Sequence, residues 1–325
     1  MKFPARLACL AALALALPLA PPTAMAQDYP TKSIRVIAPV SAGGLTDIIL
    51  RAMATKMSPV LNGQTVVVEN MPGAGTMVGT AALARAVPDG YTWGIGASGA
   101  LAANPHMQKT LPYNPQKDFA PVCKIGAAAY ILVANPAFGV KTLPELLAKA
   151  KSGKVTFASP GLGSSPHMAQ ELFKAKVATP FLHVPYKGTA PAVNDTIAGH
   201  TQVLFEAGGP LAPHIKSGKL VAIGVTSGKR LASLPDVPTF EELGYKDIRL
   251  EGWIGIMLPA GTPQAIVTKA SEACKTALAA PDVQAHGVAN GFEVDYAGPA
   301  EFAAFIASEY QKWGDLIRLA GIKPE

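Results

Sequence analysis

Residues 34–53 read IRVIAPVSAGGLTDIILRAM, and this stretch is enough to assign a fold class. The β-branched run at 34–38 predicts a buried strand. Apolar residues then recur at helical spacing from Thr46 onward, which predicts an amphipathic helix. Glycines between the two elements mark a tight turn from strand to helix. A strand that leads directly into a helix is the repeating unit of α/β proteins with a parallel sheet, so we expect that class.

The same strand-to-helix unit recurs along the chain. It restarts after Asn135-Pro136, where Thr142 and Glu145 form a capping box for a helix at 143–151. Two similar halves in series predict two lobes with a cleft between them. Further strands are expected at 65–69, 92–96, 155–159, 181–184, 202–205 and 220–225.

Two C-terminal helices, at about 263–278 and 299–319, need an apolar surface to pack on. Our preferred arrangement returns them to the first lobe, which would leave two strands as the connection between the lobes. The predicted division is therefore 27–125 together with 250–325 as domain 1, and 126–249 as domain 2. We expect a monomer.

The first 26 residues have the pattern of a cleavable export signal. Lys2 and Arg6 precede an apolar run at 7–20, and Ala24-Met25-Ala26 fits the small-residue rule for cleavage after Ala26. A membrane anchor is the alternative, but the run is shorter than the roughly 18–20 apolar residues that span a bilayer. We therefore expect a periplasmic protein that starts near Gln27 and does not itself span the membrane.

Composition argues against a protein that binds nucleic acid. The sequence holds 28 basic and 22 acidic residues, so without Lys2 and Arg6 the chain carries a net charge of +4. The basic residues are scattered, whereas a nucleic-acid groove needs them clustered. Mild positive charge is compatible with an anionic ligand.

Two cysteines, Cys123 and Cys274, remain after the leader. An oxidising compartment would permit a bridge between them, but nothing in the sequence marks one. Both stand in apolar surroundings, so two buried free thiols are the favoured interpretation.

Two loops are candidates for binding an anion, SAGG at 41–44 and GLGSS at 161–165. Each follows a strand and opens a helix, where free backbone N–H groups and the positive end of the helix dipole converge. Tight turns without any ligand are the alternative interpretation of the same residues. Because the loops occupy equivalent places in facing lobes, we favour a clamp, and a ligand with a carboxylate at each end would match it.

Two further side chains are candidates for ligand contact. His167 lies in the first turn of the helix behind the second loop and could donate to a carboxylate, although a packing role is equally compatible. Glu206 ends a predicted strand, and the carboxyl ends of strands face the cleft in open α/β sheets. A capping or hinge role is the alternative for Glu206. Tyr186 and Lys187 could also line the cleft.

Motifs for catalysis, cofactors and metals are absent from the sequence. The G-x-G at 73–75 is followed by Gly79, so it misses the dinucleotide fingerprint by one residue. Ser98 lacks the spacing of a nucleophile elbow. No Walker loop, C-x-x-C pair or histidine spacing typical of a metal site occurs. We therefore predict no cofactor, no metal and no catalytic residue.

Short motifs in a fixed order extend this interpretation to the whole chain after the leader. They are YPTKSIR (29–35), GGLTD (43–47), VENMPGAG (68–75), PDGYT (88–92), LPY (111–113), KDFAPV (117–122), HVPYKG (183–188), LPDVPT (234–239) and AGTP (260–263). With them the sequence resembles the Bug (TctC-like) family of tripartite tricarboxylate transporter receptors. The resemblance implies a type II-like periplasmic-binding-protein fold, or "Venus flytrap", with two mixed or parallel sheets joined by a two-strand hinge. It also implies a protein that delivers a small carboxylate to membrane transporter subunits.

The resemblance further implies which residues touch the ligand. Members of the family usually hold a carboxylate on backbone amides of the first loop and reach the second lobe through ordered water. Ser98 is a weaker candidate on that pattern. The other implied contacts are Val40, Ser41, Ala42 and Gly43 in the first loop, and Gly163, Ser164 and Ser165 in the second.

Departures from the family pattern bear on the ligand. Val40, Ser41 and Ala42 stand where the family usually has prolines and a phenylalanine, and Glu206-Ala207 stands where many relatives have Asp-Asn. These changes make an amino-acid ligand less secure and favour a dicarboxylate with an apolar middle, an aromatic acid included. The leading hypothesis is a non-enzymatic receptor that serves a tripartite tricarboxylate-type transporter. The alternatives are an extracytoplasmic sensor that signals to a membrane partner and an exported α/β enzyme.

Overall fold

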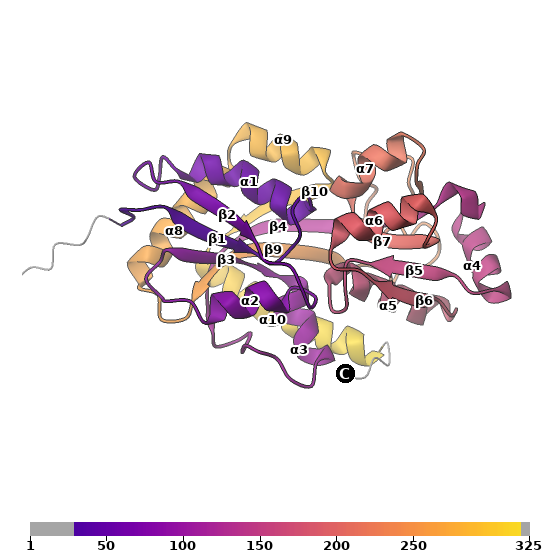
Figure 1. The fold of residues 1–325 in the computed structure, drawn as a ribbon, viewed down its shortest axis with the longest axis horizontal. Helices are drawn as coiled ribbons and strands as arrows, with labels where there is room; N and C mark the ends of the chain where they lie inside the picture. Colours follow the sequence, from indigo (N-terminus) through magenta and orange to yellow (C-terminus); the bar gives the residue numbers. More distant parts are fainter. Residues whose placement is uncertain (1–28, 320–325) are drawn as a thin grey trace, which may run out of the picture.

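A computed structural model describes residues 29–319, and the predicted export signal at 1–26 lies outside them. Figure 1 shows an elongated molecule in which helices and strands form two groups. Two long strands, β4 (Phe119–Ala134) and β9 (Glu251–Pro259), lie where the groups meet. None of the helices between residues 29 and 319 is both long and apolar enough to cross a bilayer.

The first sheet begins with three parallel strands. β1 (Ile34–Ala38) lies between β2 (Val66–Asn70) and β3 (Thr92–Ala97), with Ile34 opposite Val66 and Val36 opposite Trp93. Ile34, Val36 and Ile37 are all buried because helices cover both faces of the sheet, as parallel sheets require. In Figure 1, α1 (Leu45–Met57) and α9 (Pro281–Ala289) lie on one face, with α2 (Met77–Ala84) and α10 (Pro299–Leu319) on the other.

Three antiparallel strands complete this sheet. β9 pairs with β3 on one side and with β4 on the other, and β10 (Phe292–Ala297) pairs with β4. Of the C-terminal helices, α8 (Gln264–Leu278) packs on α1 and β4, and α10 packs on β4 as well. In α10, Trp313 donates its indole N–H to the buried Glu309, which also accepts the indole N–H of Trp253 in β9, both at 3.0 Å.

The second sheet repeats the parallel arrangement. β5 (Thr156–Ser159) lies between β6 (Leu182–Pro185) and β7 (Val203–Ala207), and β7 and β8 (Val221–Val225) pair antiparallel with β4. Four helices surround it: α4 (Leu143–Ser152), α5 (Ser165–Val177), α6 (Thr189–Ala198) and α7 (Gly208–Lys216). The predicted capping box of Thr142 and Glu145 is present at the start of α4.

Two chain segments cross side by side from one sheet to the other. β4 pairs with β9 as far as Ala129 and with β7 and β8 from Tyr130 onward. The return crossing lies at Leu250, whose N–H donates to the carbonyl of Thr226 at 3.2 Å. The Thr226 hydroxyl donates back to the Leu250 carbonyl at 2.5 Å and accepts the N–H of Tyr130 at 2.9 Å. Because both crossings lie within a few residues of 125/126 and 249/250, we retain that domain division as a proposal.

β4, β9 and β10 were not predicted from the sequence. β4 reads FAPVCKIGAAAYILVA, in which a proline, a glycine and a run of alanines hide the strand pattern. Its pairing with β9 shifts register between Pro121 and Cys123 and again between Lys124 and Gly126. The strand therefore forms because neighbours pair with it on both sides, and local propensity contributes little.

The free-thiol prediction was wrong, because Cys123 of β4 and Cys274 of α8 form a disulfide. The two residues are 151 positions apart in the sequence, and their Cα atoms are 6.7 Å apart in the fold. The bond covalently attaches α8 to β4, the strand that continues from the first sheet into the second. Sequence spacing could not show it, since only the packing of α8 on β4 brings the two side chains together.

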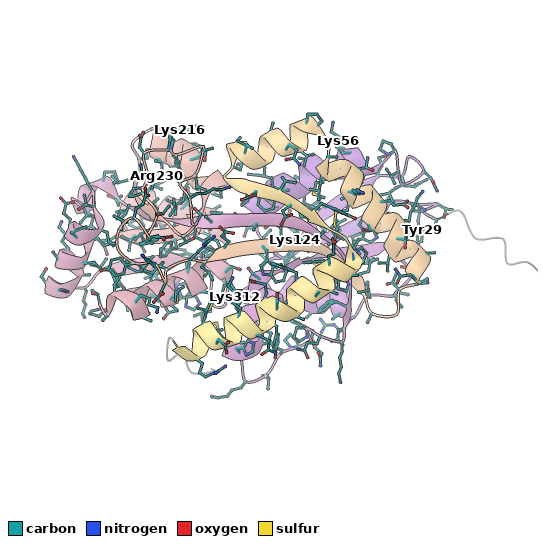
Figure 2. All side chains as sticks on the ribbon, turned by 180° about the vertical axis from the view of Figure 1, so that it is seen from behind. Tyr29, Lys56, Lys124, Lys216, Arg230 and Lys312 are labelled. Atoms are coloured by element: carbon teal, nitrogen blue, oxygen red, sulfur yellow. A yellow bond between two sulfur atoms is a disulfide. The ribbon has the colours of Figure 1, made fainter. Side chains whose placement is uncertain are left out.

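Basic side chains are spread over the surface. Figure 2 labels Lys56, Lys124, Lys216, Arg230 and Lys312, which lie at separate places along the molecule. Several are paired with acids, such as Lys56 with Asp282 at 2.7 Å and Arg230 with Glu242 at 3.0 Å. The labelled basic side chains are therefore distributed along the molecule and do not form one cluster.

Candidate functional site

A cavity of about 330 Å³ lies between the loops of the two sheets. Its size falls at the small end of the range typical of ligand pockets. Loops that follow β1, β2 and β3 line one side, and loops that follow β5, β6 and β7 line the other, with β4 and β9 behind them. Six of the predicted contact residues line the cavity: Val40, Ser41, Ser98, Ser164, Ser165 and Glu206. Four do not: Ala42, Gly43, Gly163 and His167.

The first loop is held from below by a buried carboxylate. Asp47, which is only 3% exposed, accepts the N–H of Gly43 at 3.0 Å and also accepts donors from Arg51 and Asn70. Burial alone would raise the pKa of Asp47, but the hydrogen bonds from Arg51, Gly43 and Asn70 outweigh burial and lower it. Asn70 also donates to the carbonyl of Val40 at 3.1 Å. The Gly43 amide is therefore occupied inside the protein and is not the free donor that we expected.

Free backbone donors lie one step further along, at the start of α1. Gly44 precedes this helix and provides no side-chain cap. The N–H groups of Leu45 and Thr46 have no acceptor among residues 29–319, and both residues line the cavity. Unpaired N–H groups at a helix N-terminus, together with the helix dipole, favour an anion. The anion position predicted for the first loop thus moves from Gly43 to the first turn of α1.

The second loop satisfies most of its own donors. The Ser164 hydroxyl donates to the carbonyl of Gly161 at 2.7 Å and caps α5 by accepting the N–H of His167 at 3.4 Å. The N–H of Gly163 donates to Nδ1 of His167 at 3.1 Å. Ser165 is the member of this loop whose hydroxyl reaches the other lobe, 2.7 Å from the hydroxyl of Ser98.

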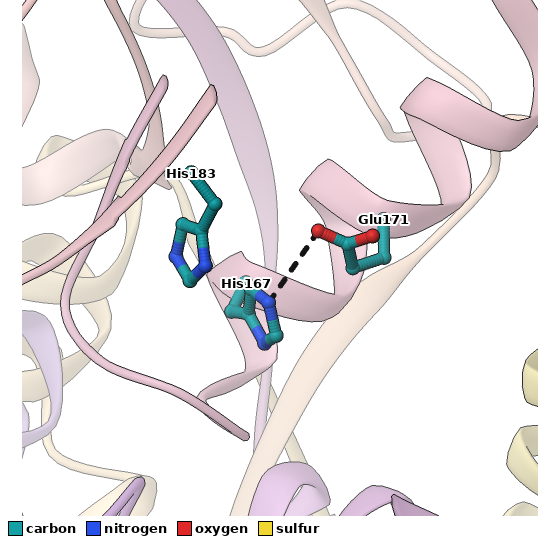
Figure 3. A group of neighbouring side chains, drawn as sticks. All are labelled: His167, Glu171 and His183. Atoms are coloured by element: carbon teal, nitrogen blue, oxygen red, sulfur yellow. Dashed lines mark ion pairs between the residues drawn. The ribbon is translucent and has the colours of Figure 1, made fainter. Parts of the chain in front are cut away.

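His167 belongs to a cluster behind the second loop, shown in Figure 3. Its ring stacks on His183 with centroids 4.3 Å apart, and its Nε2 lies 3.5 Å from Glu171. Burial, together with the neighbouring His167, lowers the pKa of His183 to about 4. Burial would raise the pKa of Glu171, but hydrogen bonds from His167 and Lys174 bring it to about 2.

These three side chains bring ligating atoms within 4.8 Å of one another. The two imidazole planes are only 16° apart and face each other, so their in-plane lone pairs do not converge on a single ion. His167 Nδ1 is already occupied by the Gly163 amide, and Glu171 by Lys174 at 2.8 Å. The cluster is therefore arranged to hold the second loop.

Contacts across the cavity show a closed arrangement of the loops. Besides the Ser98–Ser165 contact, the Ser41 hydroxyl donates to the carbonyl of Lys187 at 3.2 Å. The backbone of Gly75 lies against the carbonyl of Leu162, so closely that a Cβ on Gly75 would lie 1.9 Å from that oxygen. The loops of the two sheets thus meet directly over the cavity.

Glu206 lies at the end of β7, as predicted, and is only 5% exposed. One of its carboxyl oxygens accepts the hydroxyl of Thr189 at 2.9 Å, and the other accepts the N–H of Ala207 at 2.7 Å. Burial raises the pKa of Glu206 to about 7, against the lowering effect of these two hydrogen bonds. No lysine, arginine or histidine of the described residues comes within 4.0 Å of it.

Tyr130 is a cavity residue that the sequence analysis missed. At this residue β4 passes from one sheet to the other. Its hydroxyl lies near Ser165 and Ser98, and burial raises the pKa of this hydroxyl. Gly252 on β9 leaves the space for this hydroxyl, since a Cβ there would lie 1.7 Å from its oxygen. Trp253, Phe292 and the loop at 72–76 also line the cavity. Tyr130, Trp253 and Phe292 lie in β4, β9 and β10, the strands that were not predicted from the sequence, so their place in the cavity was not predicted either.

The chain matches a family model described as "Tripartite tricarboxylate transporter family receptor" over residues 49–322. It is 36% identical to the protein BugT of Bordetella pertussis over 301 residues, which cover 92% of each chain. Two solved structures from Rhodopseudomonas palustris are also similar. Rpa4515 with adipate has a TM-score of 0.87 at 28% identity and covers 91% of this chain and 100% of that one. MatC with bound malate has a TM-score of 0.85 at 30% identity, covering 89% and 100%. The predicted two-lobed α/β fold class is confirmed.

Proposed function

We propose a function from the premise that this chain belongs to the tripartite tricarboxylate transporter family of receptors. In this proposal the chain is a periplasmic protein that closes its two lobes on a small organic carboxylate. It would then deliver that ligand to the membrane subunits of a tripartite transporter. The closed cavity is the observation that carries the proposal. It has unpaired N–H groups of Leu45 and Thr46 and the hydroxyl of Ser98 on one side, the hydroxyl of Ser165 on the other, and that of Tyr130 behind them.

A dicarboxylate suits the two ends of this cavity. The first carboxylate would sit at the N-terminus of α1, where Leu45 and Thr46 provide donors and the helix dipole stabilises negative charge. Trp253, Phe292 and Ala128 contribute apolar surface to the cavity lining, which favours a ligand with an apolar middle. The adipate and malate carried by the two structural relatives support a carboxylate as the ligand.

The cavity also supports a receptor without catalysis. The serines that line the cavity are Ser41, Ser98, Ser164 and Ser165, and a serine nucleophile needs a base within hydrogen-bond reach. Nδ1 of His167 is occupied by the Gly163 amide, and its ring faces His183 and Glu171, away from the cavity lining. The proposed function is therefore binding and release of an unchanged ligand.

Ligand-dependent stabilisation and calorimetry test the proposal. A panel of aliphatic dicarboxylates, tricarboxylates, aromatic diacids and acidic amino acids is titrated into the protein, and the ligand is analysed for chemical change afterwards. A ligand present at a hundred times its Kd is expected to raise the free energy of unfolding by roughly 2.7 kcal/mol. Stabilisation by none of the carboxylates, or turnover of any of them, would contradict the proposed function.

A matched pair of serine variants tests the position of the site. Ser41→Ala removes a hydroxyl that lines the cavity and donates across it. One lost hydrogen bond of about 1 kcal/mol corresponds to a rise in Kd of about fivefold. Ser152→Ala removes an exposed hydroxyl at the end of α4, which bonds only to the carbonyl of Lys149, and should leave Kd unchanged.

A further inference from the structure

Glu206 creates an electrostatic problem for the carboxylate ligand just proposed. Among residues 29–319, it is the one carboxylate that lines the cavity. Its two oxygens meet only neutral donors, the Thr189 hydroxyl and the Ala207 N–H. A ligand carboxylate that enters the cavity would therefore face an uncompensated carboxylate that is only 5% exposed to solvent.

The charged groups around Glu206 do not remove this problem. The ionisable residues that share the cavity lining are Tyr130 from β4, and Tyr186 and Lys187 from the segment between β6 and α6. The Lys187 side chain is exposed and makes no ion pair with Glu206. Glu251, at the start of β9, adds negative charge near Tyr130. The described neighbours of Glu206 therefore provide no buried positive charge.

Two carboxylates held together in a low-dielectric site do not both stay ionised and instead share one proton. We propose that Glu206 takes up one proton from solvent when the protein binds a dianionic dicarboxylate. The protonated Glu206 then donates a hydrogen bond to a carboxylate of the ligand, so that ligand and proton are bound together. This inference rests on the proposed function and concerns a carboxyl group near the start of α1, since the Thr189 hydroxyl bonded to Glu206 lies 3.8 Å from the position of a Cβ on Gly44.

The state of Glu206 before binding makes this proton uptake accessible. Burial raises the pKa of Glu206 to about 7, so near neutral pH the carboxyl group is already close to half protonated. A second negative charge beside it raises the pKa further. The number of protons taken up per ligand should therefore depend on pH, small below pH 6 and close to one above pH 8.

Calorimetry of wild-type protein with adipate measures this number directly. Titrations are run in phosphate and in Tris, whose ionisation enthalpies differ, and the difference in observed heat reports the protons exchanged with buffer. From a pKa of about 7 we expect about 0.9 proton taken up per adipate at pH 8 and about 0.1 at pH 6. The Kd should rise about fiftyfold between pH 7 and pH 9.

Two glutamate variants test whether Glu206 is the group that takes up the proton. Glu206→Gln keeps a hydrogen-bond donor at the same place without an ionisable group, so proton uptake should vanish and Kd should no longer depend on pH. Glu242→Gln is the control, because Glu242 lies outside the cavity lining and the hydrogen bond from Arg230 lowers the pKa of its carboxyl group, which keeps it ionised throughout this pH range. Proton uptake by the Glu242→Gln variant should match the wild type.

The outcomes separate this inference from the proposed function. Adipate or another dicarboxylate that binds at pH 8 without proton uptake by the wild type would overturn the inference and leave the receptor function standing. The inference would also be overturned if acidic amino acids bind the wild type without proton uptake and this binding is lost in Glu206→Gln. Glu206 would then be an ionised partner of the ligand's ammonium group. Binding of no carboxylate at all would overturn the proposed function first. Should Glu206→Gln fail to fold, infrared spectroscopy of the wild-type protein is the second measurement. Adding adipate at pH 8 should produce the absorption band of a protonated carboxyl group, and the absence of this band would count against the inference.

Discussion

Replacing Gly75 with alanine should weaken ligand binding by preventing the lobes from closing. Gly75 has a φ of +58°, and a Cβ there would lie 1.9 Å from the carbonyl oxygen and 2.9 Å from the carbonyl carbon of Leu162. Ordinary contact begins at 3.4 Å, so the two loops would have to separate by roughly 1.5 Å. The atoms in the way belong to the backbone of the opposite loop, which cannot turn aside as a flexible side chain could.

That separation disrupts the hydrogen bonds that join the lobes. The Ser98–Ser165 contact of 2.7 Å and the Ser41–Lys187 contact of 3.2 Å would both exceed hydrogen-bonding distance. At about 0.5–1.5 kcal/mol each, the closed form loses about 1–3 kcal/mol. Because the ligand binds the closed form, the Kd should rise by roughly 5- to 150-fold.

Gly63→Ala is the matched control for backbone strain. Gly63 also has a positive φ, +75°, but nothing lies within 4 Å of the position of its Cβ. Both variants should lose about 1 kcal/mol of stability in urea unfolding without ligand, since alanine is strained at positive φ. In isothermal titration with a carboxylate that binds the wild type, only Gly75→Ala should show the higher Kd. Equal Kd values for the two variants would mean that the contact between Gly75 and Leu162 is not needed for binding.

Three further predictions concern the stability of the fold. Reduction of the Cys123–Cys274 disulfide, or the double alanine variant, should lower the free energy of unfolding by about 2–4 kcal/mol in urea titrations, because the bond restricts a long loop of the unfolded chain; an unchanged midpoint would contradict this. Asp47→Ala leaves three donors without their acceptor and should lower the free energy of unfolding by about 2–3 kcal/mol. It should also raise Kd, because the first loop is displaced. Asp282→Ala on the surface is the control and should change the free energy of unfolding by less than about 0.5 kcal/mol. Stability should also depend on pH through two opposing groups. The pKa of His183 in the folded protein is about 4, below the ordinary value of 6.5, so its contribution to the free energy of unfolding is lost as pH falls from 6.5 towards 4. The pKa of Glu206 in the folded protein is about 7, above the ordinary value of 4.5. Its contribution to the free energy of unfolding, about 3 kcal/mol, is therefore lost as pH rises from 4.5 to 7. Urea unfolding between pH 4 and pH 8 should show the Glu206 slope alone in His183→Gln and the His183 slope alone in Glu206→Gln, and identical slopes in both variants would contradict the assignment.

Local features of the fold followed from sequence because neighbouring residues produce them. The capping box of Thr142 and Glu145 forms as predicted, since both halves of the motif lie within one turn. The strand at 34–38 and its helix were recognised for the same reason: a β-branched run, a glycine turn and a helical spacing all lie within twenty residues. β4 escaped detection because its pairing with β7, β8, β9 and β10 stabilises it from outside.

The candidate site shows the same limit at finer scale. Sequence placed two glycine-serine loops at the cavity, and Ser41, Ser98, Ser164, Ser165 and Glu206 do line it. It could not show which amides were free. Gly43 donates to a carboxylate and Gly163 to an imidazole, each four residues further along, and those side chains are turned inward by the packing of their helices.

From its sequence alone, this protein can be identified as a two-lobed α/β member of a receptor family, because strand-to-helix units and family motifs are local patterns that survive without knowledge of contacts. The placement of the free donors at Leu45 and Thr46, of Tyr130 between the sheets and of the Cys123–Cys274 bond follows only from the assembled fold. Each depends on residues far apart in the chain, whose meeting is set by packing and burial. The charge of Glu206 belongs to the same group, since burial by surrounding elements, and no neighbour in sequence, brings its pKa to about 7.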